Sequence, residues 1–366
     1  MKSNYKKLGQ YIRPVDVRNT EGKEENLLGV SVQKQFIPSI ANTVGTDFTK
    51  YKVVRKGQFT YIPDTSRRGD KIGIALLEDY DEGLVSNVYT VFEVIDENQL
   101  MPEYLMLWFS RPEFDRYARY KSHGSVREIF DWDEVCNVEL PVPSIEEQRS
   151  IVKAYKAITD RIALKKQIND NLAEYLNCAY MELSQEIKET VPLSSICRYV
   201  TEKAAFSDID TLFYISTENI LPDKQGVSSF GTAMPTERLT PFQAEDVLVS
   251  NIRPYFKKMW FATVNGGCNA DVLCFRALDK QYTYLLKSIM YQDSFFDYVM
   301  SGAKGTKMPR GDKQHIMLYP VPRIPDQELQ QFNSLAHSIE QNQAQNRQEI
   351  SSLTVLKDML LATLSR

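Results

Sequence analysis

Two long polar segments of the chain carry apolar residues at heptad spacing. They cover residues 145–187 and 326–364, and each keeps one heptad frame over about five repeats. A pattern sustained over that length predicts coiled-coil helices rather than surface helices of a globular domain. The residues that we expect in the helix seam, where they pack between helices and help to dock partners, are Ile151, Tyr155, Ile158, Ile162, Leu172, Leu176, Phe332, Ile339, Ile350, Leu353 and Leu360.

Polar residues occupy the same seam near the middle of both segments: Lys165 and Asn169 in the first, Gln343 and Asn346 in the second. Buried polar residues at such positions cost stability but can fix the register and the partner of a coiled coil. The alternative is that their side chains reach solvent along an open part of the seam. The sequence leaves both interpretations open.

The segment before each long helix has the shorter periodicity of strands, interrupted by Gly, Asp and Pro. The predicted strands of a first globular domain lie at residues 26–32, 59–62, 71–77 and 87–95. An apolar stripe at residues 102–120 predicts a single helix after them. A second domain repeats this order, with a predicted strand at residues 246–250 and a predicted helix at residues 282–298.

One short motif occurs twice. PVPSIEEQ at residues 141–148 returns as PVPRIPDQ at residues 320–327, an offset of 179 residues. A repeat of that length indicates a duplicated domain with its helix, since solenoid repeats are about 20–50 residues long. The predicted fold class is therefore α+β, with two β-rich globular domains joined by two long coiled-coil helices in a pseudo-two-fold duplication. The predicted boundaries are residues 1–140 and 190–320 for the domains, and 141–189 and 321–366 for the helices.

Composition places the chain among ordinary soluble proteins, because 43% of its 366 residues are apolar and 25% are charged. No stretch approaches the roughly 18 apolar residues of a membrane span. Five cysteines without CxxC spacing indicate free thiols in a reducing compartment, so we expect a cytoplasmic protein. A net charge of −4 argues against a uniformly basic nucleic-acid binder, yet residues 50–71 carry seven Lys and Arg against two Asp.

The motifs of catalysis are missing from the sequence. The three histidines, His123, His315 and His337, are scattered and lie in no HExxH or CxxC context, so no metal site is expected. The glycine-rich stretch at residues 302–307 lacks the spacing of a phosphate-binding loop, and there is no GxSxG turn. We interpret the chain as non-catalytic, with no cofactor of its own.

Basic loops that contain glycine recur at equivalent places in the two domains. One lies before the last strand of each domain (residues 121–127 and 304–313), and another joins two strands (residues 65–71 and 251–258). Glycine allows close approach of a backbone, and Arg, Lys, Ser and Asn donate to phosphates and base edges. Solubilising loops have a similar composition, but recurrence in both halves favours a shared binding role.

The doubled element of strand, Pro-x-Pro and an acidic start to a long helix resembles the specificity subunits of Type I restriction–modification systems, over essentially the whole chain. VSNIRP at residues 249–254 also resembles that family, whereas PDQ at residues 325–327 departs from the EEQ of the first copy. The resemblance implies two target-recognition domains, each reading half of a bipartite double-stranded DNA site, on antiparallel spacer helices. The implied DNA-binding residues are Arg67, Arg68, Lys71, Ser125, Arg127, Asn251, Arg253, Lys257, Lys258, Lys304, Lys307 and Arg310.

The same resemblance implies protein partners and their cofactors. Two methyltransferase (modification) subunits would dock on the helices and bring S-adenosylmethionine to methylate adenine. Restriction subunits, where the complex includes them, would add translocation and cleavage that use ATP and Mg²⁺. None of this machinery, and no membrane contact, is expected in the chain itself.

Other classes of function stay open at this point. A duplicated coiled-coil adaptor that binds proteins would show no salt-dependent DNA affinity. A fused methyltransferase–specificity enzyme would need a cofactor-binding domain, for which the chain offers no room. A decoy or phase-variable specificity subunit would have the same sequence features as an active one.

Overall fold

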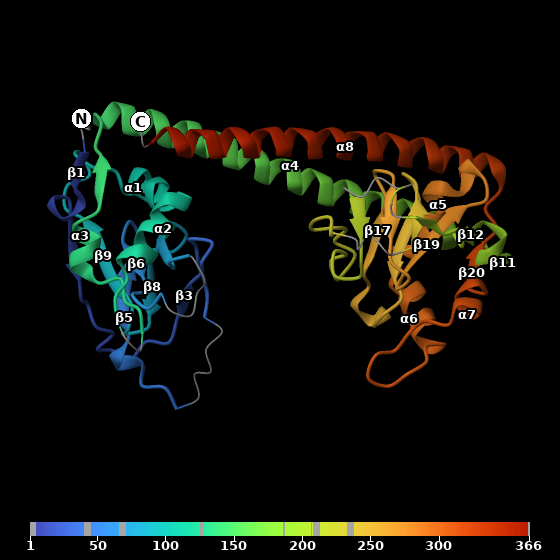
Figure 1. Ribbon diagram of the computed structural model, residues 1–366, viewed down its shortest axis with the longest axis horizontal. Coiled ribbons are helices and arrows are strands. Elements are labelled where there is room, and N and C mark those ends of the chain that lie inside the picture. Colours follow the sequence, from blue (N-terminus) through green and yellow to red (C-terminus); the bar gives the residue numbers. More distant parts are fainter. Residues whose placement is uncertain are drawn as a thin grey trace. The chain divides into compact units, whose positions relative to one another are not determined.

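The computed structural model describes residues 5–39, 45–65, 71–124, 127–185, 187–205, 207, 213–232 and 238–364. The chain divides into two compact units: Met1–Lys165 with Glu349–Arg366 is unit 1, and Lys166–Gln348 is unit 2. Each unit contains one β-rich head and part of each long helix (Figure 1). The unit boundaries therefore fall inside the helices, and the four-part division drawn from the sequence stays a prediction.

The head of unit 1 is built around an antiparallel sheet with the strand order β2-β9-β6-β7. Its strands are β2 (Ile12–Val15), β6 (Phe59–Tyr61), β7 (Ile74–Leu76) and β9 (Thr90–Val94). Further antiparallel pairs are β1 (Tyr5–Lys7) with β10 (Glu139–Pro141), β3 (Leu28–Val30) with β4 (Phe36–Pro38), and β5 (Lys52–Arg55) with β8 (Glu82–Val85). The helical segments are η1 (Leu8–Gln10), η2 (Phe48–Lys50), α1 (Pro102–Phe109), α2 (Pro112–Lys121) and α3 (Trp132–Cys136).

Aromatic rings fill the space between this sheet and α1. Phe59 on β6 and Phe92 on β9 stack with ring centroids 4.8 Å apart, and Phe109 meets Phe59 edge-on at 5.8 Å. All three side chains are fully buried, and each such burial contributes about 1.5–3 kcal/mol to folding. Leu361 and Leu364, near the end of the second long helix, join the same core and so anchor that helix end to the head.

The head of unit 2 repeats this plan with the sheet order β12-β19-β16-β17. Its strands are β12 (Cys197–Tyr199), β16 (Val247–Ser250), β17 (Met259–Phe261) and β19 (Val272–Ala277). The remaining strands are β11 (Thr190–Pro192), β13 (Ala204–Ala205), β14 (Tyr214–Ile215), β15 (Arg238–Phe242), β18 (Gly266–Cys268) and β20 (Pro320–Pro322). The helical segments are η3 (Leu193–Ser195), η6 (Pro254–Phe256), η7 (Lys280–Tyr282), α5 (Thr283–Met290), α6 (Asp293–Ser301) and α7 (Lys313–Met317).

The single helix predicted before each Pro-x-Pro motif is wrong, because each is two helices. Arg111, between α1 and α2, has an extended backbone with φ −77° and ψ 140°. It precedes Pro112, and the residue before a proline avoids the helical region. In unit 2, Gln292 is extended in the same way between α5 and α6. The predicted strand at residues 71–77 shortens to β7.

Strand register shows that the two halves superpose with an offset different from the one read off the motif. Pro141 pairs with Tyr5 in the first residue pair of β1 and β10, and Pro322 pairs with Thr190 in the corresponding pair of β11 and β20. Pro141 is thus equivalent to Pro322, an offset of 181 rather than 179 residues. The fully buried Gln148 then corresponds to the buried Leu329, whereas Gln327 is exposed. The motif match was therefore out of register by two residues.

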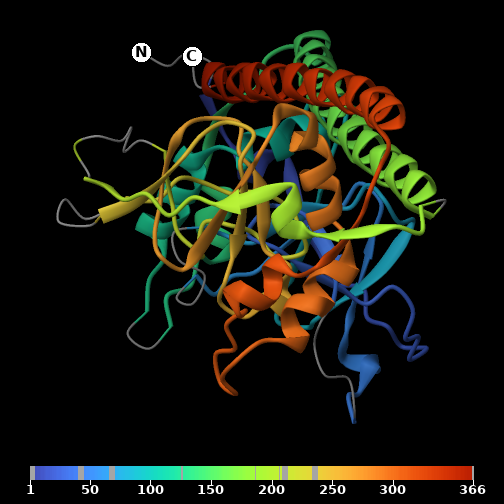
Figure 2. The same ribbon diagram turned by 90° about the vertical axis from the view of Figure 1, so that its right-hand side faces the viewer.

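The two long helices, α4 (Ile145–Gln185) and α8 (Asp326–Thr363), pack antiparallel as expected (Figure 1). All of the predicted seam residues are buried or half-buried. Ser144 and Glu147 form a reciprocal cap at the start of α4, because the Ser144 amide donates to the Glu147 carboxylate and the Glu147 amide donates to Ser144 Oγ. Beside the head of unit 2, α5 lies against α8 (Figure 2), where Tyr284 Oη and His337 Nδ1 are 2.9 Å apart.

Three of the four polar residues of the seam meet inside unit 2. Gln343 Nε2 donates to the backbone oxygen of Asn169, and Asn346 Nδ2 donates to Asn169 Oδ1, each over 2.8 Å. Gln343 and Asn346 are each only 7% exposed, so their side chains do not reach solvent. Lys165, in unit 1, is half-buried and pairs with Glu349 at 3.0 Å.

No helix among the described residues is both long and apolar enough to cross a membrane. The cysteines are all free thiols, with Cys178 exposed, Cys136 half-buried, and Cys197, Cys268 and Cys274 buried. Burial raises the pKa of the Cys197 and Cys268 thiols to about 12, which makes both poor nucleophiles.

Candidate nucleic-acid interface

Two loops of the head of unit 2 meet edge to edge. The first follows β16 and contains Arg253, and the second is a hairpin between α6 and α7. The hairpin is closed by Lys304 and Arg310, whose backbones exchange two hydrogen bonds of 2.9 Å. The Arg253 amide donates to the Pro309 carbonyl at 2.8 Å, and Ile252 bridges Arg310. The two loops therefore present one continuous surface, on the side of the head away from α8 (Figures 1 and 2).

Unit 1 contains the same arrangement. His123 and Ile129 close its hairpin, and Ile129 also bridges Asp64, which follows β6. The Thr65 amide donates to the Glu128 carbonyl at 3.0 Å, as Arg253 does to Pro309 in unit 2. The hairpin positions correspond at the 181-residue offset found for the strands, so Ile129 stands where unit 2 has Arg310. Asp64 and Thr65 correspond to Ile252 and Arg253 at an offset of 188 residues.

A glycine makes each hairpin possible. Gly124 has φ +142° and Gly305 has φ +96°, both in the region that side chains rarely adopt. A Cβ atom on Gly124 would also lie 1.9 Å from the Arg127 carbonyl oxygen. The glycines that the sequence marked as signs of close approach are thus required by the hairpins themselves.

Three predicted cations stand out on the hairpin of unit 2. Lys304, Lys307 and Arg310 are exposed, and Arg310 pairs with Asp271 at 3.1 Å while its side chain stays 55% exposed. Lys304 pairs with Asp312, and with two backbone amides this holds the pKa of Asp312 at about 2. Long exposed cations on a fixed hairpin are suited to contact phosphates and base edges.

The other four predicted residues of unit 2 are turned toward the protein. Lys257 pairs with Asp293 at 3.1 Å, and Lys258 Nζ donates to the Thr217 carbonyl at 2.8 Å. Lys224 and Lys257 together hold the pKa of Asp293 below its usual value. The predicted Asn251 and Arg253 are half-buried, and Asn251 Oδ1 and Arg253 Nε have no hydrogen-bond partner among the described residues. These residues shape the loop more than they extend from it.

In unit 1, Lys71 and Arg127 are exposed. Arg127 borders a cleft of about 490 Å³ together with Asp64 and Ile129 of the bridged loops and with Val88 and Tyr89 of the turn before β9. The predicted residues Arg67, Arg68 and Ser125 lie outside the residues that the structure describes.

Sequence reasoning missed two groups of residues in this region. One is the acids that hold the cations, Asp271, Asp293 and Asp312, because their pairing joins distant segments and leaves no local signal. The other is a set of exposed apolar side chains on the same loops, Tyr255, Phe256 and Met308. The sequence signal that could have identified these apolar residues was their position within basic loops.

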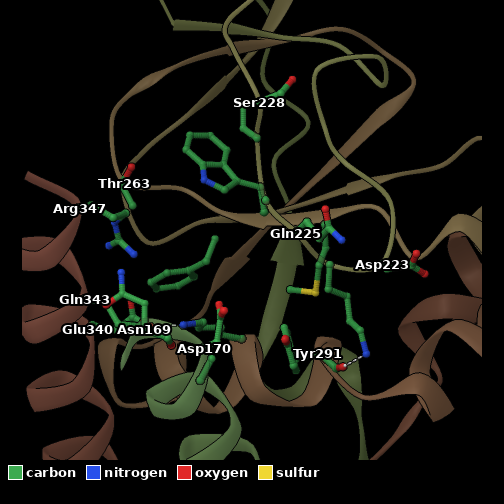
Figure 3. Close-up of a pocket in the computed structure, with 18 of the residues that line it drawn as sticks. Asn169, Asp170, Asp223, Gln225, Ser228, Thr263, Tyr291, Glu340, Gln343 and Arg347 are labelled. Carbon is green, nitrogen blue, oxygen red and sulfur yellow. Dashed lines mark hydrogen bonds and ion pairs between the residues drawn. The ribbon is translucent and has the colours of Figure 1, made fainter. Parts of the chain in front are cut away.

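A separate cleft of about 540 Å³ lies in unit 2 between β17, the loop at residues 223–230, α5 and the long helices (Figure 3). Asn169 and Gln343 lie beside each other on its helix side, and Ser228 lies on its loop side. Two amines line it. Lys287 pairs with Glu340 and sits 5.1 Å from the Phe261 ring, and Lys224 pairs with Asp293 at 2.7 Å. Both lysines of this cleft are therefore held by carboxylates of the same unit.

Within the described part of the chain, no three His, Cys, Asp or Glu side chains group to hold a metal ion. Each head instead presents its own surface of hydrogen-bond donors and cations. Among the described residues, this surface contains no reacting centre. The fold and the loops together define a duplicated protein with a cationic, donor-rich loop surface on each head.

Comparison with known proteins gives one family match, over the first part of the chain. Residues 2–174 match the family described as Type I restriction modification DNA specificity domain. The crystal structure of a Type I restriction–modification S subunit from M. genitalium is similar over 99% of this chain and 96% of that chain, with 13% identity and a TM-score of 0.60. The match over residues 2–174 confirms the resemblance for that part of the chain, and the shared structure confirms the fold class inferred from sequence.

Two further solved chains are similar at 17% identity. One comes from a study of complex assembly and conformational transition of a Type I system, with a TM-score of 0.47 and coverage of 99% and 97% of the two chains. The other is an HsdS subunit from Thermoanaerobacter tengcongensis, with a TM-score of 0.38 and coverage of 99% and 96%. No curated protein sequence matches the chain.

Proposed function

We propose that this chain is a specificity subunit and reads a bipartite double-stranded DNA site, one half with each head. The observation that carries the proposal is the duplicated loop pair, joined at equivalent backbone positions in both heads. Each loop pair carries exposed cations, among them Arg127 in unit 1 and Arg310 in unit 2. Two similar sets of donors suit a target in two parts, because each half-site presents its own row of base edges and phosphates.

The long helices supply a surface for the modification subunits. Tyr175 on α4 and Val355, Leu356 and Met359 on α8 are between 50% and 61% exposed. Val355, Leu356 and Met359 lie within two turns of one helix, and contiguous apolar side chains of this kind mark protein interaction sites. Two methyltransferase subunits docked here would bring S-adenosylmethionine, and restriction subunits would bring ATP and Mg²⁺. The complex would act on DNA in the cytoplasm.

The experiment that tests the proposal is to co-express the chain with a modification subunit encoded beside it and to map methylated adenines by single-molecule sequencing. A split motif, with specified bases on both sides of an unspecified gap, is the expected result. A stable complex that methylates nothing would contradict target reading and leave a decoy. Failure to form any complex, without salt-dependent DNA affinity, would favour the protein-binding adaptor.

Residue roles on the two hairpins can be tested in the same complex. Arg127→Ala and Arg310→Ala should each weaken binding to the mapped site by about 1–3 kcal/mol, because each removes an exposed donor. Arg323→Ala is the matched control, since Arg323 is 66% exposed and pairs with Glu189 at the start of α8, away from the hairpins. Affinities equal to the control in a titration at fixed salt would contradict the assignment.

A further inference from the structure

An exposed aromatic pair stands at the tip of the loop that follows β16. Tyr255 is 47% exposed and Phe256 is 39% exposed, and their ring centroids are 4.6 Å apart. Exposed apolar side chains that lie together can mark an interaction site, and this pair lies on a loop that also carries Asn251, Arg253, Lys257 and Lys258.

The backbone under the pair is fixed at both ends. Arg253 and Lys257, which flank η6, both take the left-handed conformation with φ 50°. Such strain persists only where surrounding contacts enforce it, and it concentrates at functional sites. Here the contacts are the buried Pro254 and two hydrogen bonds of 2.9 Å, from the amides of Asp223 and Lys224 to the carbonyls of Phe256 and Lys257. The rings are therefore presented rigidly.

A third apolar side chain extends the pair onto the neighbouring hairpin. Met308 is 47% exposed and precedes Pro309, the residue that bonds Arg253. It lies two residues before the bridging Arg310, as Arg127 lies two residues before Ile129 in unit 1. The same backbone position thus carries a cation in one head and an apolar group in the other.

We propose that Tyr255, Phe256 and Met308 form an apolar wedge that inserts at one base step of the DNA half-site bound by the second head. The proposal rests on the proposed function. Base faces are the apolar part of DNA, and proteins that insert apolar side chains unstack a step and kink the duplex. Lys304, Lys307 and Arg310, exposed on the adjoining hairpin, match the phosphates on either side of such a step. This charge pattern favours DNA over a protein as the occupant.

The test uses the assembled complex and duplexes that carry the mapped site with 2-aminopurine placed at successive positions of the second half-site. With the wild-type complex, fluorescence should rise at one step, because 2-aminopurine brightens when it is unstacked. The double variant Tyr255→Ala/Phe256→Ala should abolish that rise and weaken binding about ten-fold or more, the size expected from lost stacking. A mismatched base pair at the same step should restore most of the affinity that the double variant loses, because the mismatch already lowers the free-energy cost of unstacking.

Leu278→Ala is the control, because Leu278 is an apolar residue of unit 2 that is 54% exposed and lies outside both loops. Tyr255→Phe should bind and brighten the probe like wild type, since it keeps the ring. If wild type binds its site but the double variant gives the same affinity and fluorescence, the wedge is wrong and the proposed function stands. If the double variant loses the modification subunits instead, the pair is a protein contact. If wild type binds no site, the proposed function itself fails.

Discussion

At the scale of single residues, the cations of the second head are already paired in the free protein. Arg310 pairs with Asp271, Lys304 with Asp312 and Lys257 with Asp293. Exposed pairs of this kind add little to stability, on the order of 0–1 kcal/mol. Their effect is on binding, because a phosphate must compete with a carboxylate for each cation. If these cations meet phosphates as proposed, the acids would restrain binding to DNA of any sequence.

Asp271→Asn releases Arg310 and should raise the affinity for DNA without a target site. The plot of log affinity against log salt concentration should steepen by up to about 0.9, the contribution of one additional phosphate contact. Glu218→Gln removes the same charge from an exposed position of unit 2 and serves as the control. A slope and affinity equal to the control would mean that Arg310 does not meet phosphate.

Gln148 shows how one side chain joins a helix to its head. Its side chain is fully buried; Oε1 accepts from the Met101 amide, and Nε2 donates to the carbonyls of Gln99 and Pro143, each over 2.9 Å. The equivalent residue in unit 2 is the apolar Leu329, so only the first head uses this polar clasp.

Gln148→Ala should destabilise unit 1 by about 2–4 kcal/mol, because it leaves a buried amide and carbonyls unsatisfied. Gln327→Ala changes the same residue type at an exposed position of the matching motif and should be nearly neutral. Thermal and urea unfolding of both variants would decide this, and equal stabilities would show that water replaces the clasp.

At the scale of elements, the polar cluster of Asn169, Gln343 and Asn346 resolves the two interpretations of the seam. Because Gln343 and Asn346 are buried and bonded to the opposite helix, they favour one register. Lys165 is different, since it is half-buried and reaches Glu349 at the edge of the seam.

Replacing both residues with leucine (Gln343→Leu with Asn346→Leu) should stabilise the helix pair by on the order of 1–2 kcal/mol through apolar burial. It should also loosen pairing specificity, so that some of the protein self-associates. Gln345→Leu with Gln348→Leu places the same side chains at exposed positions and is the control. Melting curves and sedimentation would measure both effects. A double variant that is less stable than wild type and strictly monomeric would contradict the register role.

Elements were predictable from sequence where periodicity is long and local. The heptad frames of α4 and α8 coincide with their buried positions, because a helix fixes which residues share a face. The predicted offset between the two halves was wrong by two residues because it was taken from the similarity of the two proline motifs. The equivalent residues are identified by the register of the paired strands, which the sequence does not show. The helix break at Gln292 has no proline and left no comparable signal.

At the scale of the whole molecule, the duplication gives two cores that share no residue. Phe92 belongs to one core and Phe275 to the other, and both are fully buried at equivalent strand positions. Stability is therefore divided between two separately packed interiors.

Phe92→Ala and Phe275→Ala should each cost about 3–5 kcal/mol. Their effects should add to within about 0.5 kcal/mol in the double variant, since the two core clusters have no residue in common. Hydrogen exchange should report each loss only in the unit that holds the substitution. Faster exchange in both units for a single substitution would show that the cores are coupled.

The proposed DNA-binding surface was less predictable than the fold. The positions of the loops were predicted from their glycine and basic residues. The orientation of the side chains was not predicted, because Lys257 and Lys258 are held by Asp293 and Thr217, which lie in distant segments of the chain. The exposure of Tyr255 and Phe256 was not predicted, because tyrosine and phenylalanine are abundant in the chain and these two did not stand out.

The paired hairpins also bear on how new specificities arise. Because Gly305 sets the turn and the bridge between Lys304 and Arg310 fixes its ends, we expect substitutions at residues 306–308 to leave the head folded. Arginine at 127 and methionine at 308 are two outcomes of such variation on one backbone. A library confined to residues 306–308 would therefore sample altered DNA preferences at little cost in folding, and an evolving lineage could change its target by the same small steps.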